Sequence, residues 1–145
     1  MKIKPLIPFI AAVVAAVGMG IIDPSMPVRS QENRSPSAFI AIDGDTIKSP
    51  AGVKYRLLGL DAPETYLAKC IEELDLGTAA KRRLQELIDT GKARLVESGR
   101  IDKYGRTLAT LHIAGADVAG ILIKEGLARP YAGGKREGWC PAVTQ

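Results

Sequence analysis

The sequence predicts a small α+β domain, because short apolar strands bounded by turn residues are interrupted by one amphipathic helix. Its 145 residues, 46% of them hydrophobic, are enough for a single domain with its own core. No internal repeat is visible in the chain. Several short strands with a helix between the third and fourth are typical of a five-stranded OB-fold β-barrel with about two helices, which we expect over residues 38–145.

Two or three antiparallel strands are expected before the main helix. Ala38–Ile42 is apolar, and the acidic and small residues of Asp43–Thr46 predict a turn after it. A second, hairpin-like turn at Ile47–Gly52 leads into the apolar stretch Val53–Leu60.

The main helix is expected to begin with Thr78 as its N-cap and to end at Gly91. Its apolar residues recur at helical spacing, at Ala80, Leu84, Leu87 and Ile88. Two further strands follow at 93–98 and 105–113, and a second helix is expected at 118–128. The Gly- and Pro-rich residues from 129 onward predict coil.

The N-terminal segment, residues 1–22, has a different character. Pro5 to Ile22 carries no charge and follows a start that contains Lys2 and Lys4, as in a signal peptide or a membrane anchor. The run is long for a signal peptide and short for a membrane span, so both alternatives stay open. Either one predicts export to the periplasm or the outside, with membrane attachment if the segment is uncleaved. Residues 23–37, with three prolines, predict a flexible linker.

The net charge and the histidine content limit the kinds of reaction that the domain could catalyse. The first 37 residues hold four of the 20 Lys and Arg and two of the 16 Asp and Glu, so the remaining chain has a net charge of only +2. Such a mild excess does not identify a nucleic-acid binder by itself. His112 is the only histidine, and it alternates out of phase with Leu111 and Ile113, which predicts a solvated side chain. This excludes most hydrolases that depend on a histidine base.

The chain has two cysteines, Cys70 and Cys140, and no CxxC motif, which argues against a zinc site. In an exported domain we expect them to form a disulfide, worth roughly 4 kcal/mol by the chain-entropy model. Two free, buried thiols are the alternative.

Four carboxylates fall in two tight groups, Asp43 with Asp45 and Asp61 with Glu64, each at the end of a strand. Grouped carboxylates repel one another unless a cation lies between them, and oxygen ligands without nitrogen or sulfur select Ca²⁺ or Mg²⁺. The alternative is that the Asp-Gly-Asp sequence is only a turn.

Arg56 and Arg106 could bind phosphate, because the planar guanidinium can hold two phosphate oxygens at once. Arg56 and Asp61 are an odd number of residues apart, so they converge only if the strand bends, which Gly59 permits. The alternative is that both arginines form ordinary surface ion pairs.

Four ordered segments, "IDGDTI", "YRLLGLDAPET", "DKYGR" and "LIKEGLARPY", resemble the staphylococcal nuclease (thermonuclease) family over residues 38–131. The resemblance implies an OB-type barrel and Ca²⁺-dependent cleavage of phosphodiester bonds in DNA and RNA. It also implies that Asp45, Asp61 and the backbone carbonyl of Ala62 bind Ca²⁺, while Asp43 acts through water.

For catalysis, the resemblance implies that Glu64 positions or deprotonates the attacking water, while Arg56 and Arg106 bind the scissile phosphate. Lys103 and Tyr104 resemble residues that border the nucleotide pocket, and Tyr131 could stack on a base or simply pack. Family members also carry a further C-terminal helix, which we expect to be missing here, with the disulfide tying the tail back over the barrel.

The expected function is therefore that of an exported, monomeric, Ca²⁺-dependent nuclease with little sequence preference. The alternative is a non-catalytic module on the same fold that binds nucleic acid or a protein partner.

Overall fold

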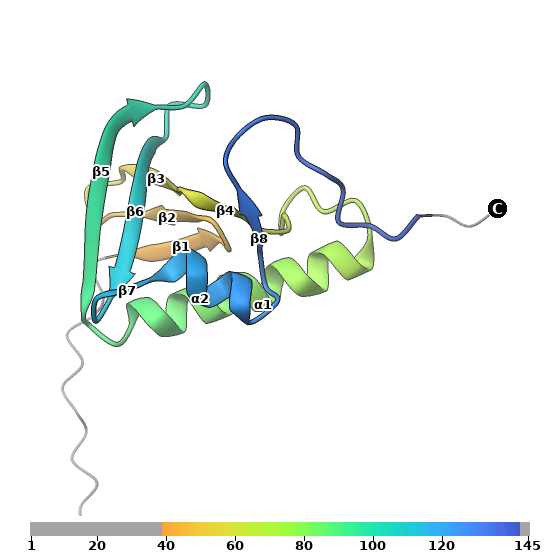
Figure 1. The fold of residues 1–145 in the computed structure, drawn as a ribbon, viewed down its shortest axis with the longest axis horizontal. Coiled ribbons are helices and arrows are strands. Elements are labelled where there is room, and N and C mark those ends of the chain that lie inside the picture. The colour runs from red at the N-terminus through yellow and green to blue at the C-terminus, as the bar shows by residue number, and fades with distance from the viewer. Residues whose placement is uncertain (1–38, 143–145) are drawn as a thin grey trace, which may run out of the picture. The chain divides into compact units, whose positions relative to one another are not determined.

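The computed structural model describes residues 39–142, and Figure 1 shows the arrangement of their strands and helices. The predicted N-terminal segment and the whole predicted linker, residues 23–37, lie outside these residues. Within them, no helix is both long and apolar enough to cross a membrane. In chain order the elements are β1 (Ile40–Asp43), β2 (Thr46–Lys48), β3 (Lys54–Leu57), β4 (Gly59–Asp61), α1 (Ile71–Ile88), β5 (Ala93–Ile101), β6 (Thr107–Ile113), β7 (Ala116–Asp117), α2 (Val118–Lys124) and β8 (Arg129–Tyr131).

The main sheet has the strand order β1-β2-β3-β6-β5, with the short β7 also pairing with β6. Strands β3 and β6 are parallel, whereas the other neighbours are antiparallel. Helix α1 packs on β1, and α2 packs on β6 and on α1, so both helices cover the apolar side of the strands (Figure 1). The predicted α+β class and its five-stranded OB-type sheet are confirmed.

The apolar stretch expected as one strand, Val53–Leu60, is divided into β3 and β4. Gly59 has a φ of 87°, a left-handed conformation that glycine adopts without a steric penalty. The chain bends there, and β4 leaves the main sheet to pair with β8. This bend is what brings Arg56 and Asp61 to the same place.

The predicted start of the main helix is wrong. Helix α1 begins at Ile71, with Cys70 as its N-cap, and Thr78 lies inside it. The carboxylate of Glu73 accepts a hydrogen bond of 2.8 Å from the N–H of Lys69 and thereby satisfies a backbone donor before the first turn. The apolar pattern missed this part because Ile71 and Leu74 are exposed.

The C-terminal end also differs from the prediction. Helix α2 ends at Lys124 and is shorter than expected, with Asp117 accepting a hydrogen bond from the N–H of Ala119 at its start. The segment expected to be coil from residue 129 begins with a strand, β8. Its pairing with β4 places the residues that follow beside Asp61.

Candidate active site

Two loops of the barrel carry the buried carboxylates. Asp45 lies in the turn between β1 and β2, Asp61 ends β4, and both residues are at most 5% exposed. The N–H of Ala62 donates a 3.3 Å hydrogen bond to Asp45 Oδ2 and joins the two loops. Gly44 allows this approach, because a Cβ there would lie 2.8 Å from the Cβ of Ala62, and also 2.6 Å from that of Ala80 on α1.

Glu64 is positioned by the close approach of its loop to α1. A Cβ at Gly77 would lie 2.8 Å from the carbonyl oxygen of Glu64 and 2.9 Å from that of Pro63. Only glycine therefore permits this contact between helix and loop. The Glu64 side chain is partly exposed, so its carboxylate can meet solvent water.

Arg56 is buried beside Asp45. Its Nη2 lies 3.0 Å from Asp45 Oδ2, and its guanidinium also donates to the carbonyl oxygens of Leu57 and Leu60. Burial lowers the pKa of Arg56, although the charge of Asp45 opposes that shift. The bend at Gly59 presents the Leu60 carbonyl to the arginine, so the same backbone feature fixes Arg56 and Asp61.

Arg106 reaches the same area through Thr46. Its Nη1 lies 3.3 Å from Thr46 Oγ1, and the Thr46 hydroxyl donates to Asp45 Oδ1 at 2.9 Å. Asp102 fixes the guanidinium from the other side, with distances of 2.8 Å to Nε and 2.7 Å to Nη2. Burial raises the pKa of Asp102, but hydrogen bonds from Arg106 and Tyr104 outweigh it and hold the pKa below its ordinary value.

Three other residues singled out in the sequence lie at the edge of this group. Asp43 accepts a hydrogen bond from the Thr65 hydroxyl. Tyr104 is 70% exposed, and the ammonium group of Lys103 lies 5.0 Å from its ring centroid. The guanidinium of Arg106 approaches the same ring at 5.3 Å, so this exposed aromatic borders the predicted phosphate-binding arginine.

Sequence reasoning missed two arginines of the C-terminal segment. Arg136 lies among the carboxylates of Asp45, Asp61 and Glu64, at distances of 3.6, 3.0 and 3.0 Å. Burial lowers the pKa of Arg136, but the three carboxylates raise it by more, so its pKa lies above the ordinary value for arginine. Arg129 pairs with the other oxygen of Asp61 at 3.0 Å. The position of Arg129 opposite Asp61 depends on the β4–β8 pairing, which the sequence pattern did not predict.

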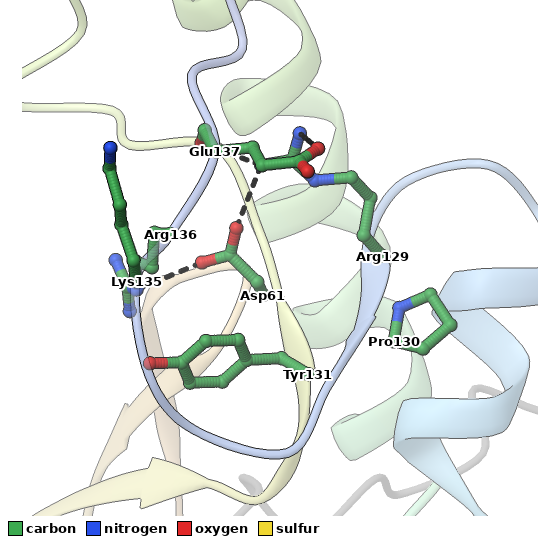
Figure 2. A pocket seen from close by; sticks show the side chains of 7 residues that line it. All are labelled: Asp61, Arg129, Pro130, Tyr131, Lys135, Arg136 and Glu137. Atoms are coloured by element: carbon green, nitrogen blue, oxygen red, sulfur yellow. Dashed lines mark hydrogen bonds and ion pairs between the residues drawn. The ribbon is translucent and has the colours of Figure 1, made fainter.

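An open pocket of about 440 Å³ lies at this junction (Figure 2). Its lining combines cationic, acidic and aromatic side chains from β4, β8 and the tail: Asp61, Arg129, Pro130, Tyr131, Lys135, Arg136 and Glu137. The Tyr131 hydroxyl donates to the carbonyl of Gly134 at 2.7 Å. The ring of Tyr131 lines one side of the pocket, and the Arg136 guanidinium lies 5.8 Å from the centroid of this ring.

Cys70 and Cys140 form a disulfide in the structure, with 5.8 Å between their Cα atoms. The bridge joins the tail to the first residue before α1. Glu73 also lies close to both sulfurs, but disulfide sulfurs are not metal ligands of the thiolate kind, so this group is not a metal site.

The donor set at the barrel loops fits a hard cation. Asp61 Oδ1 is buried and accepts no hydrogen bond from the described residues, although Arg136 Nε lies within ion-pair distance. A buried carboxylate oxygen without a donor is costly unless a cation faces it. Asp45, Asp61 and Glu64 offer only oxygen atoms, which Ca²⁺ and Mg²⁺ prefer.

Comparison with known proteins identifies the family. A family model described as "Staphylococcal nuclease homologue" matches residues 54–138, more than half of the chain. The chain belongs to the staphylococcal nuclease family. The matched region contains Arg56, Asp61, Glu64 and Arg106, and it extends through the tail to Arg136.

Several curated proteins are similar to this member of the staphylococcal nuclease family. Endonuclease YncB of Bacillus subtilis is 43% identical over 95 residues, which are 61% of this chain and 44% of that protein. The SPbeta prophage-derived endonuclease YokF of B. subtilis is 41% identical over 97 residues, 61% of this chain and 31% of that protein. An uncharacterized endonuclease of Haemophilus influenzae is 32% identical over 93 residues, 61% of this chain and 48% of that protein. The matched region is thus less than half of each relative.

Proposed function

We propose that this protein is an exported, Ca²⁺-dependent nuclease that hydrolyses phosphodiester bonds of DNA, and of RNA as a second substrate, with little sequence preference. The proposal rests on one observation above all. Asp45, Asp61, Glu64 and Arg56, from separate loops and strands, meet at one place in a chain of the staphylococcal nuclease family. The names of the relatives, all endonucleases, support the same reaction class.

Asp45 and Asp61, with the Ala62 carbonyl, are the residues that would hold the cation, and Asp43 would act on it through water. When bound, Ca²⁺ supplies positive charge that polarises the phosphate. This charge also reduces the repulsion between the anionic phosphate and the water oxygen as that water loses its proton. The chain's own contribution is to hold these oxygen donors in buried, fixed positions.

Arg56 and Arg106 are proposed to bind the non-bridging oxygens of the scissile phosphate. Backbone carbonyls and Asp45 fix Arg56, and Asp102 fixes Arg106, so neither guanidinium has to be ordered when substrate arrives. Their positive charge stabilises the negative charge that develops as the water oxygen bonds to phosphorus and the bond to the 5′-oxygen breaks.

Glu64 is proposed to position the attacking water and to accept its proton. Its carboxylate is partly exposed and faces the same place as Asp45 and Asp61. The reaction needs no contact with a particular nucleobase, which fits a nuclease with little sequence preference. Lys103, Tyr104 and Tyr131 would contact the flanking nucleotides by charge and stacking.

The proposal of export is supported by two features. The charge-free run that follows Lys2 and Lys4 has the composition of a signal peptide or anchor. The disulfide between Cys70 and Cys140 is of a kind that persists in oxidising compartments.

The test is to incubate the purified full chain with plasmid, single-stranded DNA and RNA, in Ca²⁺ and in chelator. We expect cleavage in Ca²⁺ that is lost in chelator and reduced about 10²- to 10³-fold or more in Arg106→Gln. Arg100→Gln is the matched control, because Arg100 is an exposed arginine on β5 outside the site. Binding without cleavage by the wild type would instead favour the non-catalytic module.

A further inference from the structure

The guanidinium of Arg136 lies where a cation would neutralise the carboxylates. Its Nε is 3.0 Å from Asp61 Oδ1, its Nη1 is 3.0 Å from Glu64 Oε1, and its Nη2 is 3.6 Å from Asp45 Oδ2. Three nitrogens of one side chain therefore face three carboxylates from separate positions in the barrel. The side chain is 34% exposed, so it reaches the site from the solvent side and covers it.

The tail holds Arg136 in this position through contacts on both sides. On the β8 side, Arg129 donates to the carbonyl oxygens of Glu137 and Gly138 at 2.9 and 3.0 Å. The Arg129 guanidinium also stacks on the ring of Trp139, 3.7 Å from its centroid. Beyond Trp139, the disulfide fixes Cys140 to the start of α1. The backbone around Arg136 is thus anchored on both sides.

The negative charge of the three carboxylates can be balanced by Arg136 or by a divalent ion, but not by both at once. Asp45, Asp61 and Glu64 carry three negative charges, and Arg56 and Arg129 already pair with two of these carboxylates. Arg136 brings the sum to zero. A divalent ion on the same oxygens would lie close to the Arg136 guanidinium and be repelled by it.

We propose that Arg136 is a built-in counter-cation of the carboxylate site, which stabilises the metal-free protein and competes with the divalent ion for Asp45, Asp61 and Glu64. This inference rests on the proposed metal site. Cation binding requires the Arg136 side chain to leave the carboxylates, so its removal strengthens metal binding and weakens the metal-free fold.

The first experiment titrates the full chain with Ca²⁺ alone, without nucleic acid, by calorimetry. We expect Arg136→Gln to bind Ca²⁺ about tenfold more tightly than the wild type, within the usual range of coupling between two sites. Lys135→Gln is the matched control, because it removes one positive charge from the adjacent residue and should change the affinity less than about threefold. Equal or weaker Ca²⁺ binding by Arg136→Gln would overturn the proposal.

The second experiment measures thermal unfolding of the same variants in chelator and in Ca²⁺. In chelator we expect Arg136→Gln to lower Tm by about 4–8 °C, because the carboxylates then repel one another without a counter-ion. Saturating Ca²⁺ should remove most of this difference. Arg136→Lys, which keeps the charge, should retain the wild-type Tm more closely and bind Ca²⁺ with intermediate affinity. An unchanged Tm for Arg136→Gln in chelator would contradict the stabilising role.

These measurements separate this proposal from the proposed nuclease activity. If Arg136→Gln binds Ca²⁺ more tightly but neither protein cleaves nucleic acid, the counter-cation role stands and the nuclease proposal fails. If cleavage is Ca²⁺-dependent but the affinities are equal, the nuclease proposal stands and the counter-cation role fails. If neither protein binds Ca²⁺, both fail.

Discussion

The two parts of the candidate active site are built in different ways. The barrel loops hold Asp45, Asp61 and Arg56 in buried positions, fixed by backbone hydrogen bonds and by close packing against α1. The tail after β8 holds Arg136 through a few polar contacts of Arg129 and one disulfide. The barrel therefore provides a buried acidic site, and the tail places a long, partly exposed arginine side chain against it.

The largest difference between these parts should appear when each loses an arginine. Arg56→Met leaves the buried Asp45 with only the more distant guanidinium of Arg136, at 3.6 Å, and two backbone carbonyls without their donor, which we expect to cost about 3–5 kcal/mol. Arg129→Met, on the partly exposed tail side, should cost about 1–3 kcal/mol, because Asp61 still faces Arg136. Urea unfolding of both variants measures the difference, and a greater loss for Arg129→Met would refute the distinction.

Removal of the disulfide should affect the tail more than the barrel. The bridge closes a loop with a sequence separation of 70, and the Cys70→Ser/Cys140→Ser double variant should lose up to about 4 kcal/mol by the chain-entropy model. Without it, the tail is held by the polar contacts of Arg129 and Arg136, so trypsin should cut faster after Lys135 and Arg136. Cleavage after Arg100 on β5 serves as the internal control. Equal acceleration at Arg100 would mean that the whole domain, not the tail, has loosened.

Much of the barrel side could be predicted from the sequence, because its signals are local. The acidic turn and the Gly59 bend lie within a few residues of the groups they position, so Asp45, Asp61, Glu64 and Arg56 could be named in advance. The structure shows that these four side chains lie close together, while their roles in metal binding and catalysis stay predictions. The extended start of α1 was missed because its first turns expose their apolar residues.

The tail side could not be predicted, since it depends on contacts between residues far apart in the chain. Arg136 lies 72 residues from Glu64, and its place depends on the β4–β8 pairing and the disulfide together. The Gly- and Pro-rich composition of the tail predicts only coil. The one early signal was the cysteine pair, which indicated that the tail was tethered but not what it carried.

Close packing on the barrel side can be tested with two helical glycines. Gly77→Ala places a Cβ 2.8 Å from the Glu64 carbonyl oxygen, and we expect a loss of about 1–3 kcal/mol. Gly120→Ala on α2 meets no atom within 4 Å and should stabilise the protein by about 0.5–1 kcal/mol through its helix propensity. Unfolding midpoints in urea give both values. A stabilising Gly77→Ala would show that the loop carrying Glu64 moves to accommodate the added methyl group.

The smallest effect is expected from Asp102, which fixes Arg106. Hydrogen bonds from Arg106 and Tyr104 overcome the effect of burial and hold the pKa of Asp102 below its ordinary value of 3.8. The folded state therefore binds the proton less tightly than the unfolded state, so the stabilisation is present above about pH 5 and is lost as the pH falls through the lower, folded pKa.

Asp102→Asn should accordingly be less stable than the wild type at pH 7, by about 1 kcal/mol, and the gap should narrow below about pH 4. Urea unfolding at pH 3 and pH 7 measures it. Asp75→Asn is a suitable control, because Asp75 is an exposed acid on α1. A gap between Asp102→Asn and the wild type that stays constant over this range would mean that Asp102 positions Arg106 through shape rather than through its charge.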